Sequence, residues 1–138
     1  MLSATPAAAQ TEVESATQLR RLDMMLMVTS LRCRFGSDNF QAGYEAFKRR
    51  HAATLRTAAE QALADMTRRM GRKSAIHAFD RLSTGMANSY GLGHPQLGCA
   101  ELKQAAEHLL TIDGRPALVA AANSLLDGGD GATLLAQR

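Results

Sequence analysis

Residues 19–33, LRRLDMMLMVTSLRC, constrain the fold more than any other part of the chain, because they form its most apolar continuous segment. At the spacing of an α-helix, one stripe holds Leu19, Leu22, Leu26, Thr29 and Cys33. A second apolar stripe beside it holds Met24, Val28 and Leu31. A helix that is apolar on more than one face is buried in a core. We therefore predict that this segment is the central helix of a small helical domain.

The composition favours helices in the rest of the chain as well. Alanine, leucine and methionine supply most of the 46% hydrophobic share, whereas aromatic residues make up 4% and tryptophan is absent. Ala, Leu and Met are good helix formers, and the β-branched residues that favour strands are sparse. The length of 138 residues suits one domain, and no run reaches the roughly eighteen apolar residues of a membrane span. We predict an all-α, single-domain bundle of about five helices.

Helical periodicity and turn signals set the expected bounds of these helices. They are 11–32, 37 or 38 to about 70, 73 or 74 to 90, 95–99 to about 111, and 116–126. The second helix is long, and Gly43 is a weak point at which a kink could form without being required. Gly71 is suited to end that helix. In the third, five side chains are expected to face inward: Ile76, Phe79, Leu82, Met86 and Tyr90.

The N-terminal residues bear on the compartment. Small residues that end in Ala7, Ala8 and Ala9 resemble the cleavage region of a secretory signal peptide, although the charged and apolar regions of such a peptide are missing. The alternative for residues 1–10 is a disordered, alanine-rich tail. We favour a signal remnant, and therefore a periplasmic or secreted protein. Residues 11–127 are then the helical domain, and residues 128–138 a flexible tail.

The two cysteines are predicted to pair. Cys33 and Cys99 each fall on the apolar face of a predicted helix. A bond between them would close a loop of roughly 67 residues and stabilise the fold by about 4 kcal/mol in the chain-entropy model. Two buried free thiols are the alternative. A redox pair is not favoured, because the spacing is not Cys-x-x-Cys.

The titratable residues form no catalytic or metal-binding pattern. The four histidines are His51, His77, His94 and His108. None of them has another histidine or a cysteine three or four positions away, which is the spacing that a metal site on a helix needs. His77 with Asp80 would supply two ligands at most. Glu101 and Glu107 share a predicted helix but do not converge. We expect no metal, no cofactor and no enzymatic activity, and we interpret His51 as a core histidine with one hydrogen bond.

The segment 84–99, TGMANSYGLGHPQLGC, is the most distinctive candidate surface. It places polar and aromatic side chains on a glycine-rich loop beside the predicted disulfide, as recognition loops do. The candidate binding residues are Asn88, Tyr90, His94 and Gln96. The alternative is a plain connection between helices, in which Asn88 and His94 cap neighbouring backbone groups.

Basic residues form two further clusters in a chain of net charge +3. The candidate basic contacts are Arg49, Arg50, Arg68, Arg69 and Arg72. On one long helix the clusters would lie roughly 30 Å apart, which argues against a single nucleic-acid footprint. Aromatic residues for stacking on bases are not interleaved with them. A solvated face is the simplest interpretation, and contact with anionic lipid or an acidic partner is the alternative.

These observations favour a small exported protein that acts as a non-catalytic accessory subunit or binding module of the cell envelope, with a protein partner. Two alternatives stay open. One is a small secreted enzyme whose site is assembled by tertiary contacts near residues 88–96, and the other is a basic nucleic-acid-binding protein. No motif assigns the chain to a family, and no pattern indicates an oligomeric state.

Overall fold

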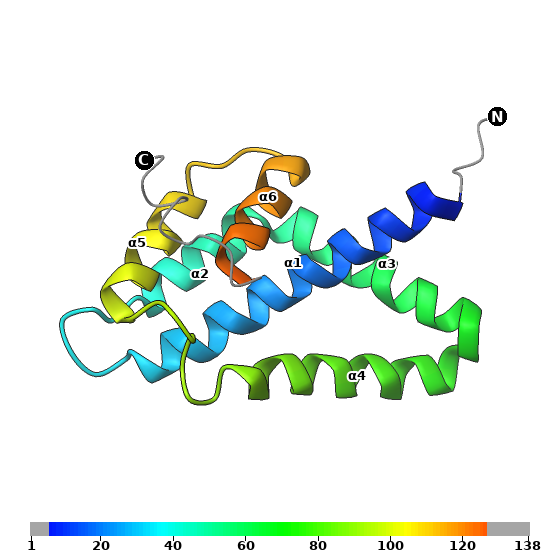
Figure 1. Cartoon of the computed structure of the whole chain (residues 1–138), viewed down its shortest axis with the longest axis horizontal. Helices are drawn as coiled ribbons and strands as arrows, with labels where there is room; N and C mark the ends of the chain where they lie inside the picture. The colour runs from blue at the N-terminus through cyan, green and yellow to red at the C-terminus, as the bar shows by residue number, and fades with distance from the viewer. Residues whose placement is uncertain (1–5, 127–138) are drawn as a thin grey trace.

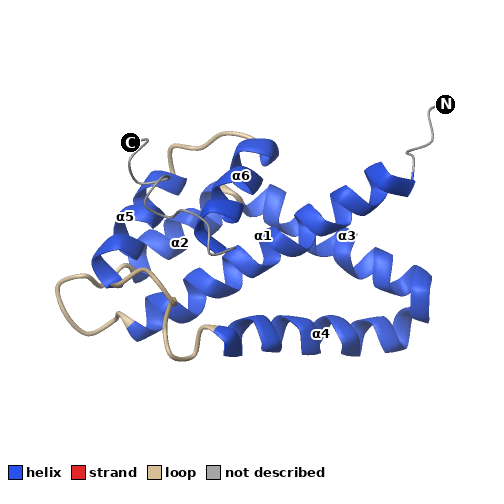
Figure 2. Ribbon diagram, viewed as in Figure 1, coloured by secondary structure: helices blue, strands red, loops and turns tan. Residues whose placement is uncertain are grey.

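The computed structural model describes residues 6–126, which fold into a single all-α bundle (Figure 1). No strand occurs in this part of the chain, as the ribbon in Figure 2 shows. The six helices are α1 (Pro6–Arg32), α2 (Gln41–Arg50), α3 (Ala52–Met70), α4 (Arg72–Ser89), α5 (Cys99–Leu109) and α6 (Arg115–Leu126). The predicted fold class is confirmed.

Helix α1 is the centre of the bundle, as predicted, because it contacts each of the other five helices. Its main stripe is fully buried: Leu19, Leu22 and Leu26 at 0% exposure, Thr29 at 1% and Cys33 at 6%. The second stripe is buried only in part. Met24 is buried, Val28 is half-buried, and Leu31 lies 46% exposed at the end of the helix.

The aromatic residues of the second predicted helix form a bulky part of the core, as their spacing predicts. Phe40, Tyr44 and Phe47 are all buried in one cluster with the leucines of α1, α5 and α6. The Tyr44 hydroxyl donates a hydrogen bond of 2.7 Å to the Asp23 carboxylate on α1. Helix α2 therefore contacts α1 through both apolar packing and one polar pair.

The single long helix predicted for residues 37–70 is two helices, α2 and α3, which change direction at His51 (Figure 1). His51 has φ −108° and ψ 18°, outside the α-helical range. Its ring Nε2 lies 2.8 Å from the carbonyl oxygen of Leu109, at the end of α5. The contact with α5 holds the backbone at this joint, whereas Gly43 lies inside α2 and does not interrupt it.

One helix boundary and one burial prediction also differ. Helix α1 begins at Pro6 instead of Thr11, so residues 6–10 of the predicted remnant or tail are helical. Residues 1–5 and the predicted tail at 128–138 lie outside the described residues. In α4, Ile76 is 41% exposed instead of inward, because the buried face of this helix runs through Ala75, at 0% exposure, and Met86.

The predicted disulfide between Cys33 and Cys99 is present, with the two Cα atoms 5.7 Å apart. It joins the residue that follows α1 to the first residue of α5. Within residues 6–126, none of the helices combines the length and apolarity needed to cross a membrane.

Candidate functional site

The four predicted binding residues do not form one open surface. Asn88 and Gln96 are exposed, but Tyr90 is buried at 7% exposure, and His94 is half-buried. The rings of Tyr90 and His94 stack with their centroids 6.1 Å apart. Two of the four side chains therefore contribute to packing.

Both ring nitrogens of His94 are bound to backbone groups. Nδ1 accepts hydrogen bonds of 3.0 Å from the backbone N–H groups of Gln96 and Leu97, and Nε2 lies 2.7 Å from the carbonyl oxygen of Leu125. Because Nδ1 accepts, the proton resides on Nε2 and is donated to Leu125. His94 thus fastens the loop to α6, which is the capping role left open by the sequence.

A pocket of about 200 Å³ opens in this region, between the end of α1, the loop before α5 and α5 itself. The disulfide lies in its wall, together with the side chains of Arg32, Leu92, Leu97 and Leu102. Leu97 and Leu102 are buried core residues. The pocket therefore has an apolar floor, and Arg32 is the charged guanidinium among its lining residues.

Three of the five large apolar side chains that are exposed among the described residues lie at this end of the molecule, and the other two, Met70 and Ile76, lie on either side of Gly71. Leu31 is 46% exposed, Phe35 81% and Leu92 94%. Figure 1 shows the loop after α1 and the loop before α5 at this end. Leu92 stands between Gly91 and Gly93, and Phe35 precedes Gly36. A large apolar residue in a glycine turn was the available sequence signal, but neither residue was among the predicted binding residues.

Two arginines hold fixed positions beside these apolar side chains. Arg32 Nη1 donates to the carbonyl oxygen of Gly91 at 2.8 Å, and Arg34 Nη1 donates to that of Leu31 at 2.7 Å. The Arg34 guanidinium also lies 4.4 Å from the centre of the Phe35 ring. Each guanidinium has five N–H donors, so one backbone bond leaves most of its capacity for an acceptor on another molecule. We call Leu31, Arg32, Arg34, Phe35 and Leu92, with the pocket, the disulfide-end surface.

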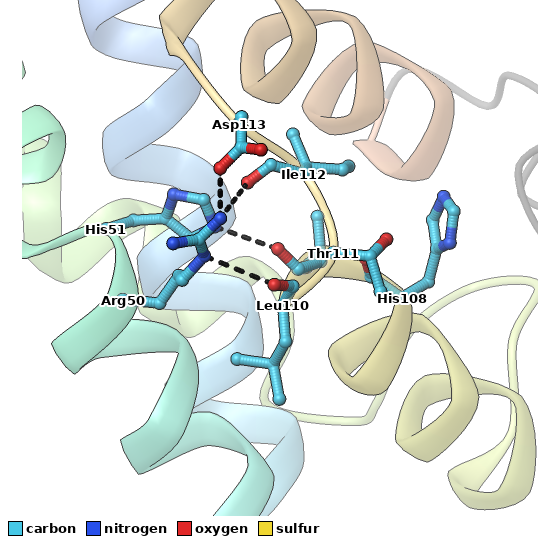
Figure 3. Close-up of polar contacts among 8 residues, drawn as sticks. Arg50, His51, His108, Leu110, Thr111, Ile112 and Asp113 are labelled. Carbon is cyan, nitrogen blue, oxygen red and sulfur yellow. Dashed lines mark hydrogen bonds and ion pairs between the residues drawn. The ribbon is translucent and has the colours of Figure 1, made fainter.

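The predicted basic contacts are not gathered into one cluster. Arg50 bonds to the segment that follows α5, where its Nε donates to Leu110 O at 3.2 Å and its Nη2 to Ile112 O at 3.4 Å and to Asp113 (Figure 3). Arg68 and Arg69 both pair with Asp65, at 3.2 and 2.6 Å. Arg49 and Arg72 are exposed. Three of the five cations are therefore paired within the chain.

The titratable groups of residues 6–126 do not form a metal-binding group of three or more His, Cys, Asp or Glu side chains. Tyr44 has a pKa well above its usual range, because its hydroxyl is buried and because the Asp23 carboxylate beside it disfavours the phenolate and accepts its hydrogen bond. Tyr44 is a buried residue of α2 that faces α1, so this shift results from core packing.

Comparison with known proteins supplies no relative: no protein-family model matches the chain, and neither the curated proteins nor the solved structures yield a significant match.

Proposed function

We propose that this protein is a small exported binding module of the cell envelope, which holds a segment of a partner protein on the disulfide-end surface without catalysing a reaction. The observation that carries the proposal is the pocket of about 200 Å³ with Leu92, 94% exposed, at its edge. Large apolar side chains that are almost fully exposed around a pocket are typical of protein interaction sites.

The size and charge of the surface indicate the chemistry of the partner. Pockets for drug-sized molecules usually measure about 300–1,000 Å³, so this smaller one suits a single apolar side chain. Arg32 lines the pocket and Arg34 bonds to Leu31 O on the same surface, and both guanidinium groups favour carboxylates on the bound segment. The proposed partner segment therefore presents one apolar residue with acidic residues beside it.

The disulfide supports the export part of the proposal. Bonds of this kind persist in oxidising compartments such as the periplasm, and they are rare in the cytosol. Cys33 and Cys99 also form part of the pocket wall. An oxidising compartment would therefore preserve the bond and, with it, the wall of the pocket.

The alternative functions receive less support from the geometry. A catalytic His94 would have to break the hydrogen bonds to Gln96, Leu97 and Leu125 before it could act as a base. A nucleic-acid interface would need Arg50, Arg68 and Arg69, which are paired within the chain.

The test uses site-specific photocrosslinking in the cells that produce the protein. A photoreactive residue replaces Leu92, and in a matched control it replaces Ile76, which is 41% exposed at the start of α4. We expect an envelope protein to crosslink at position 92 and not at position 76. Binding of that purified partner is then measured with Leu92→Glu and Arg32→Gln variants, each of which should weaken it by about tenfold or more.

Three results would overturn the proposal. Equal crosslinking from positions 76 and 92 would indicate nonspecific contact. A purified partner that binds the Leu92→Glu variant unchanged would place the interface elsewhere. Recovery of the protein in the cytosol with both thiols alkylatable would exclude the exported form.

A further inference from the structure

A second hollow, of about 290 Å³, lies between α1 and α4. Arg21 from α1 lines it together with two rows of residues from α4 and its C-cap, Tyr90, and the members of each row are four positions apart. One row holds Arg81, Gly85 and Ser89, and the other holds Leu82, Met86 and Tyr90. The hollow therefore has two guanidinium groups, an apolar wall and, among its lining residues, no carboxylate.

The Nε atom of Arg21 has no hydrogen-bond partner among the described residues. That atom is buried away from solvent. The preceding residue differs, because Arg20 bonds to Ser83 Oγ, pairs with Asp23 and lies over the Phe79 ring. A buried donor without a partner costs about 1–3 kcal/mol, and more for a charged group. An oxyanion in the hollow would supply the missing acceptor.

Gly85 keeps the hollow open. It lies inside α4, and a Cβ built on it meets no atom within 4 Å. Glycine inside a helix costs about 0.5–1 kcal/mol relative to alanine. Packing against the protein does not require this glycine, since the space above it is empty. A ligand that lies along α4 at this point would make use of that space.

We propose that Arg21, Arg81 and Gly85 form a binding site for a short organic anion. The oxyanion head, a carboxylate or a phosphate, binds the two guanidinium groups, which recognise both groups through paired N–H donors. The apolar part of the ligand lies across Gly85 against Leu82 and Met86. The volume, near the lower end of small-molecule sites, limits this part to a short chain or one ring.

The probes for isothermal titration calorimetry are hexanoate, hexyl phosphate, inorganic phosphate and hexanol. The first two distinguish carboxylate from phosphate, and the last two separate head from tail. We expect at least one of the two amphipathic anions to bind more tightly than inorganic phosphate or hexanol. Arg21→Met and Arg81→Met should each weaken binding of that amphipathic anion by about tenfold. Arg72→Met, an exposed arginine on the same helix, should leave it unchanged.

The Gly85→Leu variant tests the site without relying on loss of charge. Its side chain enters open space, and leucine is the better helix former, so the melting temperature should not fall. Binding of the amphipathic anion should be lost. The proposal is overturned if neither amphipathic anion binds, if hexanol binds equally well, or if Gly85→Leu folds and binds as the unchanged protein does.

Discussion

Arg50 and His51 cap a helix that is distant from them in sequence. At the end of α5, carbonyl oxygens lack partners within the helix. His51 binds that of Leu109, and Arg50 binds those of Leu110 and Ile112 (Figure 3). His51 is buried at 6% exposure with this hydrogen bond, so its interpretation as a core histidine is confirmed. The role of Arg50 could not be predicted, because its acceptors lie 60 or more positions along the chain.

Replacing Arg50 should therefore destabilise the fold, whereas replacing its neighbour should not. We expect Arg50→Met to lower the free energy of unfolding by about 1 kcal/mol, because two carbonyl groups and Asp113 lose a donor. Arg49→Met removes the same charge from an exposed position and should change it by less than about 0.5 kcal/mol. Urea denaturation of both variants checks this prediction, and equal values would contradict it.

Tyr44 should make stability fall at high pH. Its pKa is raised in the folded protein, mainly by burial, whereas in the unfolded chain it is about 10. Above pH 10 the unfolded chain loses this proton and the folded protein keeps it, so unfolding becomes easier by about 1.4 kcal/mol per pH unit. Below pH 10 the contribution of Tyr44 is fully present.

The Tyr44→Phe variant isolates this effect. At pH 9 it should be less stable than the unchanged protein by about 1–2 kcal/mol, because Asp23 loses its hydrogen-bond donor. By pH 11 the difference should shrink by about 1.4 kcal/mol, since phenylalanine does not titrate. Urea denaturation at both pH values measures it. A difference that stays constant would mean that Tyr44 ionises equally in both states.

At the scale of helices, local signals predicted most boundaries and missed the joint between α2 and α3. The periodicity of α1 and Gly71 at the end of α3 are local features, and both predictions agree with the structure. The joint at His51 depends on a carbonyl group of α5, so the pattern of residues 37–70 reads as one continuous helix. A helix end that is set by tertiary contact carries no local signal.

Gly43 and Gly71 should respond oppositely to alanine. Gly43 lies inside α2, and a Cβ there would meet Ala106 Cβ at 3.6 Å, which is an ordinary contact. Gly43→Ala should therefore stabilise the protein by about 0.5–1 kcal/mol. Gly71 joins α3 to α4 with φ 82° and ψ 159°, a conformation that only glycine adopts readily. Gly71→Ala should cost about 1–3 kcal/mol.

Thermal unfolding of the two variants provides the measurement. The melting temperature should rise for Gly43→Ala and fall for Gly71→Ala. A fall for Gly43→Ala would show that the contact with α5 is too tight to accept a methyl group.

At the scale of the whole molecule, the proposed disulfide-end surface includes a residue of the predicted recognition segment but does not use the residues predicted to bind. The segment before Cys99 was expected to carry recognition, and it contributes Leu92 to the disulfide-end surface. Its polar residues were the expected contacts, yet His94 is occupied by backbone groups. Which side chain of this loop faces solvent depends on how the loop packs against α6. The spacing of residues in the sequence does not determine that packing.

The disulfide should supply a large part of the total stability. Cys33 and Cys99 are 66 positions apart, and the chain between them includes all of α2, α3 and α4. Closing a loop of that length restricts the unfolded chain and stabilises the folded state by about 4 kcal/mol in the chain-entropy model. The Cys33→Ala/Cys99→Ala double variant should lose about 2–5 kcal/mol. Alanine is chosen because Cys33 is buried at 6% exposure, where a serine hydroxyl would add its own cost.

Urea denaturation of this variant and of the reduced protein separates the crosslink from the packing. Both should be destabilised by similar amounts, because both lose the same loop closure. The Gly43→Ala substitution, added to the double variant, should restore about 0.5–1 kcal/mol, since it lies in α2 and acts through helix propensity. A double variant as stable as the oxidised protein would mean that packing around α1 alone holds α5 in place.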